Sequence, residues 1–111
     1  MPTFGIIEGL PVLKASEDIA DLGDNEIVPA VAGKRIRVTN ALIQNKSSSA
    51  VNGKFRSGTT DITAAHPLAI DGGGFSHEGK TFICETAPGE ALNFNLDGAI
   101  AVAITIEFQT V

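Results

Sequence analysis

The residues of this chain whose side chains are best suited to chemistry are two histidines, His66 and His77. Imidazole nitrogens bind divalent metals, but a metal site needs three or more converging ligands. Glu78 follows His77 directly, and neighbouring residues of a strand point to opposite faces, so this acid is not expected to share an ion with His77. No third ligand has diagnostic spacing. We therefore expect loop or solvated roles for both histidines; the alternative is a metal shared between subunits at a symmetry axis.

Three further motifs contain residue types used in catalysis or phosphate binding, without the context that such chemistry needs. A single cysteine, Cys84, excludes an internal disulfide and a cysteine-based zinc site, and its apolar surroundings predict a buried side chain. Residues 47–49 are serines, but no G-x-S-x-G motif occurs. The glycines at 72–74 lack the following helix and the Lys and Ser or Thr of a phosphate-binding loop. The sequence predicts no catalytic residue, metal or cofactor, and so no enzyme.

Charge and length restrict the classes of partner. The chain has 111 residues, with eight Lys and Arg against thirteen Asp and Glu, giving a formal net charge of −5. This length predicts one domain, and the acidic balance disfavours nucleic acid and anionic membrane surfaces. The start has no basic segment followed by an apolar run, and no stretch approaches the roughly 18 apolar residues of a membrane span. We expect synthesis in a cytoplasm, with no nucleic-acid or membrane partner.

Short alternating runs separated by glycines predict an antiparallel β-sandwich. Within residues 34–45, Ile36, Val38 and Leu42 are expected on one face, opposite Arg35, Arg37 and Thr39. Within residues 50–58, the inward set is Val51, Gly53 and Phe55, and within residues 91–97 it is Leu92, Phe94 and Leu96. The polar link at 46–50 predicts a hairpin between the first two runs, and Asp97-Gly98 predicts another hairpin into the last strand.

The first 26 residues differ from the rest, and prolines and glycines interrupt residues 1–15 every few residues, so this stretch cannot be a long regular element. Residues 16–28 allow one helical turn capped by Ser16, but the apolar stripe of Ile19 and Leu22 is thin, so we favour a strand or loop. The predicted organisation is an extended N-terminal arm or segment, 1–26, followed by a β-sandwich domain, 27–111.

The last strand has two unlike faces. Ile100, Val102, Ile104, Ile106 and Phe108 form a bulky apolar series, whereas the opposite series begins with three alanines. Either both faces are buried inside a two-layer sandwich, or the alanine series meets a neighbouring subunit near a symmetry axis. We favour the second interpretation, because closed homo-oligomers are common. The candidate interface is Phe4, Ile6, Ile7, Leu10, Val12, Ala99, Ala101 and Ala103.

The order of these motifs resembles small virion proteins of tailed bacteriophages, of the capsid decoration or cement type. The resemblance covers roughly residue 27 to the C-terminus and rests on "GKRIRV", "VNGKFRSGTTDI" and "TAPGEALNFNLDGAIAVAITI" in that order. It implies a jelly-roll-like sandwich that assembles, commonly as a trimer, in a virion made in the bacterial host cytoplasm. Its implied partners are the major capsid protein or other virion proteins.

Two alternatives remain open. The resemblance also covers tail, fibre and adaptor modules, in which the glycine-rich loop 71–79 would contact a host receptor. A basic face shared by the first predicted hairpin is a candidate contact for an acidic partner, or else a solvated face. Its members are Arg35, Arg37, Lys54 and Arg56.

Overall fold

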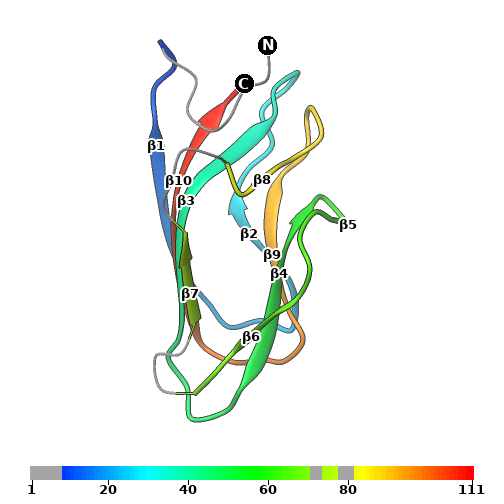
Figure 1. The fold of residues 1–111 in the computed structure, drawn as a ribbon. Coiled ribbons are helices and arrows are strands. Elements are labelled where there is room, and N and C mark those ends of the chain that lie inside the picture. Colours follow the sequence, from blue (N-terminus) through cyan, green and yellow to red (C-terminus); the bar gives the residue numbers. More distant parts are fainter. Residues whose placement is uncertain (1–8, 71–73, 78–81) are drawn as a thin grey trace.

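The computed structural model describes residues 9–70, 74–77 and 82–111, which form two antiparallel five-stranded sheets packed face to face (Figure 1). Sheet A has the order β1 (Leu13–Ile19), β10 (Val102–Thr110), β3 (Ile36–Asn45), β7 (Gly74–His77), and β8 (Cys84–Glu85) also pairs with β3. Sheet B has the order β2 (Gly23–Val28), β9 (Leu92–Leu96), β4 (Val51–Ser57), β5 (Thr60–Asp61), and β6 (His66–Leu68) also pairs with β4. The predicted all-β, two-layer antiparallel architecture is confirmed.

The core lies between the sheets and is built by the alternation that the sequence shows. The inward residues of β4, β9 and β10 are buried, and their neighbours along each strand face outward. At the centre, the rings of Phe55 and Phe94 meet edge to face, with centroids 5.0 Å apart. Cys84 is also buried, as predicted. Burying each of these large apolar side chains contributes about 1.5–3 kcal/mol, so the alternation alone accounts for most of the folding drive.

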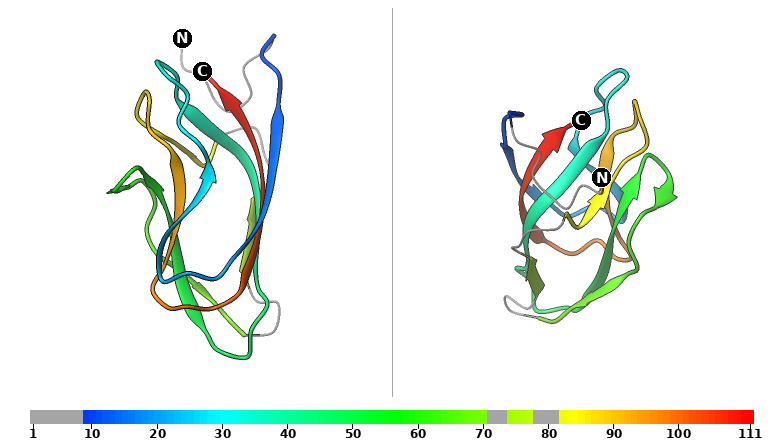
Figure 2. Two further views of the ribbon diagram at one scale, coloured as in Figure 1. Left: turned by 180° about the vertical axis from the view of Figure 1, so that it is seen from behind. Right: turned by 45° about the horizontal axis from the view of Figure 1, so that its top comes forward.

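Both predicted hairpins are wrong, because the chain changes sheet at each link. β3 belongs to sheet A and β4 to sheet B, and β9 and β10 are likewise in different sheets. Figure 2 shows these links as the loops that join the two layers at one end. A buried amide organises the first link: Asn45 Nδ2 donates to the carbonyls of Ser49 and Leu68 (2.8 and 3.2 Å), and its Oδ1 accepts from Ser47 N. The same turn residues serve hairpins and sheet-to-sheet corners.

The second link is fixed by a carboxylate. Asp97 Oδ1 accepts from the backbone N–H of Asn52 and its Oδ2 accepts from Asn52 Nδ2, both at 2.8 Å. These bonds, the backbone bond first, lower the pKa of Asp97. A carboxyl group whose folded pKa lies below its unfolded value stabilises the fold above the unfolded pKa, and this stabilisation is lost as pH falls through the folded pKa.

We therefore expect Asp97→Asn to lower the melting temperature at pH 7 and to flatten its fall between pH 5 and pH 2. Thermal unfolding followed by circular dichroism across this range measures both effects. Asn52→Ala keeps the carboxylate and the backbone donor. Its melting temperature should therefore lie between those of Asp97→Asn and the unmodified chain. Parallel pH curves for Asp97→Asn and the unmodified chain would contradict this role of Asp97.

A β-bulge corrects the predicted faces of β3. Asn40 pairs with Glu107 and Val38 pairs with Phe108, so Thr39 is an extra residue in β3, and its hydroxyl donates to the Glu107 carbonyl. The bulge reverses the alternation after Val38, as such insertions do. Leu42 therefore lies on the outer surface, 48% exposed, instead of inside.

The predicted boundary at residue 27 falls inside β2. β1 pairs with β10 in sheet A, and β2 pairs with β9 in sheet B. Residues 13–26 are thus part of both sheets and not an arm, and the alternative of a helical turn capped by Ser16 is wrong. Phe4, Ile6 and Ile7 lie outside the described residues.

Candidate protein-interaction face

The outer surface of sheet A carries small and neutral side chains at its centre. In register across β1, β10 and β3 it presents Lys14, Glu107 and Asn40, then Ser16, Thr105 and Leu42, then Asp18, Ala103 and Gln44. Ala101, directly before β10, continues the series of β10. We call these residues the alanine face.

The alanine face is partly open in the single chain. Ala101 and Ala103 are half-buried, and Ala99 is exposed. The interpretation in which the sandwich itself buries both faces of the last strand is therefore wrong. Leu10 and Val12, from the predicted interface, are 38% and 41% exposed at the start of β1.

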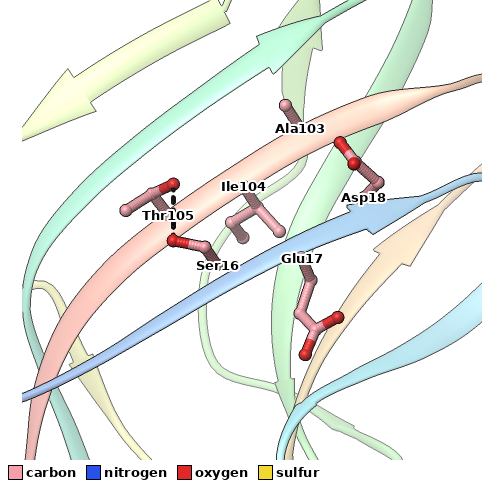
Figure 3. Close-up of a pocket in the computed structure, with 6 residues that line it drawn as sticks. All are labelled: Ser16, Glu17, Asp18, Ala103, Ile104 and Thr105. Atoms are coloured by element: carbon pink, nitrogen blue, oxygen red, sulfur yellow. Dashed lines mark hydrogen bonds between the residues drawn. The ribbon is translucent and has the colours of Figure 1, made fainter.

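Short polar contacts hold the strands of this face together. Ser16 Oγ and Thr105 Oγ1 lie 3.2 Å apart, and Asn40 Nδ2 donates to Glu107 Oε1. Figure 3 shows Ser16, Thr105, Ala103 and Asp18 on one side of β1 and β10, around a shallow depression of about 130 Å³.

The alanines also have a role within the chain. Lys46 Nζ lies 2.7 Å from Asp18 Oδ1, and the Lys46 backbone N–H donates to the Ala101 carbonyl at 2.9 Å. Since β10 runs between β3 and β1, this ion pair crosses β10 beside Ala101 and Ala103. Small side chains there leave room for the lysine. Sequence reasoning missed this contact, although the alternation of Lys14, Ser16 and Asp18 was a signal that residues 13–19 form a strand.

The outer surface of sheet B is of the opposite kind. Its charged side chains pair with one another: Lys54 Nζ lies 2.9 Å from Asp61 Oδ2, and Arg56 Nη1 lies 3.0 Å from Asp24 Oδ2. Arg56 Nε also lies 2.9 Å from Asp61 Oδ1, and Asn95 Nδ2 donates to Asp24. The hydrogen bond from Lys54 is the first cause that holds the pKa of Asp61 below its ordinary value.

The predicted basic face does not exist as one surface. Arg35 and Arg37 belong to the sheet A side, whereas Lys54 and Arg56 lie on sheet B. Glu85 pairs with both arginines, at 2.9 Å from Arg37 Nη2 and 3.6 Å from Arg35 Nε, and Arg37 stacks over the Phe82 ring. All four cations therefore have acidic partners in the chain, which disfavours their use on an acidic partner.

The residues suited to chemistry are not brought together where the structure describes them. Burial raises the pKa of the Cys84 thiol to about 12, which makes it unreactive at neutral pH. His66 lies on β6 in sheet B and His77 on β7 in sheet A. Within residues 9–70 and 82–111, no three His, Cys, Asp or Glu side chains lie close enough to hold a metal ion. The glycines at 72 and 73 and the acid at 78 lie outside the described residues.

The same part of the chain contains no helix that is long and apolar enough to cross a membrane. No family model matches the sequence, and comparison with curated proteins and with solved structures gives no match. The arguments that follow therefore rest on the strand order, the faces of the two sheets and their chemistry.

Proposed function

We propose that this chain is a virion structural protein, a capsid decoration or cement protein that associates with itself as a trimer and stabilises a head lattice. The strand order supports the proposal. The first four strands alternate between the sheets. β9 then inserts between β2 and β4 in sheet B, and β10 inserts between β1 and β3 in sheet A. We infer from this order a jelly-roll-like winding, an architecture that viral capsid proteins and lectins use.

The observation that carries the proposal is the contrast between the two outer surfaces. Sheet B carries a network of ion pairs among Lys54, Arg56, Asp24 and Asp61, which suits contact with water. The alanine face presents half-buried methyl groups, hydroxyls and the exposed Leu42, which allow another surface to approach closely. The charged members of the face, Lys14, Glu107 and Asp18, lie in its two outer rows, whereas the central row of Ser16, Thr105 and Leu42 is uncharged, as interface cores are.

The single chain has the accessible surface of a compact monomer. Its accessible surface is 5860 Å². A compact monomer of this mass is expected to expose about 5,800 Å². Association is thus between preformed units, and a specific contact needs on the order of 1,000 Å² of buried surface. Units that bind an assembled shell and not its dispersed subunits stabilise the shell by mass action, and several weak contacts made at once are enough.

We expect Ala101→Glu to dissociate the oligomer while the sandwich remains folded, because the new carboxylate would be buried against the neighbouring copy. Size-exclusion chromatography with light scattering measures the mass, and circular dichroism checks the fold. Ala30→Glu, the same change in the exposed loop between β2 and β3, is the matched control and should leave the mass unchanged. An unchanged assembly in Ala101→Glu would defeat the trimer contact.

The virion role is tested on particles. Mass spectrometry and electron cryomicroscopy of purified virus particles that carry the gene should find the chain on the head. Its copy number should be a multiple of the number of equivalent positions in the capsid lattice. Absence of the chain from purified particles would overturn the proposal.

A second candidate is a tail, fibre or adaptor module that binds a host receptor or another virion protein. A depression of about 450 Å³ at the end of sheet B favours this second candidate. Apolar side chains such as Val51 and Pro67 line the depression, together with Asn52 and Asp97. Binding to a glycan array, with a few copies per particle located at the tail, would favour this candidate over the first.

A further inference from the structure

The strand β1 is an open edge of sheet A in the described part of the chain. It pairs with β10 along all seven of its residues, and no other described strand lies beside it. Every second residue of an edge strand directs its N–H and C=O groups away from the sheet, so β1 presents a template for one more strand. Natural proteins block such edges with prolines, bulges or charged side chains, and β1 contains no proline but carries Lys14, Glu17 and Asp18, so only a strand with complementary charges can add to it.

The sequence of β1, LKASEDI, is complementary to itself when two copies run antiparallel. With a two-fold axis at Ser16, Leu13 faces Ile19 of the second copy and Lys14 faces Asp18. Ala15 faces Glu17, and the two Ser16 residues face each other. Apolar residues thus meet apolar residues, each cation meets an anion, and the acid on the inner side meets the smallest side chain.

The exposure of these side chains fits such a pairing. Leu13 is 41% exposed although it lies on the inner side of β1, and the Asp18 side chain is 76% exposed. Lys46 bonds Asp18 through Oδ1. Opposite charges placed directly across an antiparallel pair stabilise the pairing.

Neighbouring registers of the same pairing are worse. An axis at Glu17 sets the two Glu17 carboxylates against each other, and an axis at Ala15 sets Leu13 against Glu17. Each shift also separates Lys14 from Asp18. Like charges and mismatched pairs in the wrong registers select the one centred on Ser16.

We propose that β1 binds β1 of a second copy of this chain, antiparallel and centred on Ser16, joining two A sheets into one continuous sheet. The contact places the two alanine faces side by side in one surface. It is independent of the proposed trimer, and together the two contacts would link trimers to one another. Seven paired residues bury less than the roughly 1,000 Å² of a stable interface, so the pairing is weak in dilute solution and strengthened wherever copies are arrayed.

Cross-linking tests the register directly. Cysteines that replace Ser16 would face each other across the two-fold axis, with Cβ atoms about 4.5–5.5 Å apart, within reach of dibromobimane. Cys84 is buried and does not compete. We expect Ser16→Cys to give mostly covalent dimers, at a rate at least tenfold above that of Ser48→Cys, an exposed cysteine in the loop between β3 and β4. Equal rates for the two variants would overturn the pairing.

Charge reversal separates pairing from chance collision. In the Ser16→Cys background, Lys14→Asp and Asp18→Lys each place like charges opposite one another. Because the two-fold axis repeats the Lys14–Asp18 pair, each substitution changes two pairs, and we expect the rate of cross-linking to fall about tenfold. The double variant restores the complementarity and should recover most of the rate. Lys46→Ala, which removes only the partner of Asp18 within the chain, should leave it unchanged. Equal yields in the single and double variants would contradict the proposal.

The same assay separates this contact from the trimer. Ala101→Glu in the Ser16→Cys background should keep the cross-link, because Ala101 is not one of the β1 residues, Leu13–Ile19, that make the pairing. Loss of the cross-link in this variant, with the fold intact, would show that the pairing depends on the other interface and would overturn its independence.

Discussion

Phe94→Ala is expected to lower the free energy of unfolding by about 3–5 kcal/mol, the cost of deleting a buried aromatic ring and leaving a cavity. Phe94 is fully buried on β9, and its ring packs edge to face on Phe55. A domain of this size has a total stability of about 5–15 kcal/mol. The variant should therefore lose a large part of this stability.

Urea denaturation followed by circular dichroism measures the change for Phe94→Ala. Leu42→Ala is the matched control, since it also truncates a large apolar side chain of a central strand, but one that is 48% exposed on the outer surface. It should cost under about 1 kcal/mol, in the range of surface substitutions. A loss below 1 kcal/mol in Phe94→Ala would mean that the two sheets are not packed around this ring.

Gly53→Ala is the second substitution with a large expected effect, because the ring of Phe94 covers this glycine. A Cβ atom at Gly53 would lie 2.3 Å from Cε2 and 2.5 Å from Cζ of Phe94, far inside contact distance. The ring is held by Phe55 and cannot turn away freely. Overpacking of this kind costs about 1–3 kcal/mol or more.

Two comparisons identify the cause. Gly98→Ala should cost much less, because a Cβ there would meet Ile100 Cγ1 at an ordinary 3.5 Å. In a Phe94→Leu background the cost of Gly53→Ala should shrink, and a double-mutant cycle measures this coupling. An equal cost of Gly53→Ala with and without the phenylalanine ring would show that the ring is not the obstacle.

The inner faces of the sheets could be read from the sequence, but their connection could not. The alternation in β4, β9 and β10 identified Phe55, Phe94 and Ile104 as core residues, since a period of two is a local property of the chain. The links at 46–50 and 97–98 have the composition of hairpin turns. What sends the chain to the other sheet is a set of distant contacts, such as that from Asn45 to the Leu68 carbonyl.

The candidate face was also predicted only in part, because pairing between strands that are distant in sequence decides some of its residues. The alanine series follows from the alternation of the last strand. The bulge at Thr39, which places Leu42 beside Thr105, depends on how β3 pairs with β10 and leaves no mark in the local pattern. The basic residues were grouped on one face because a hairpin was assumed, and two of their acidic partners, Glu85 and Asp24, come from segments distant in sequence.

The central claim is that the alanine face is covered by another copy of the chain. Sedimentation velocity of the unmodified protein over a hundredfold range of concentration tests it most directly. The account predicts a species of about three times the 11.5 kDa chain mass that dissociates in Ala101→Glu. A single 11.5 kDa species at every concentration, with the alanine face left in water, would contradict it.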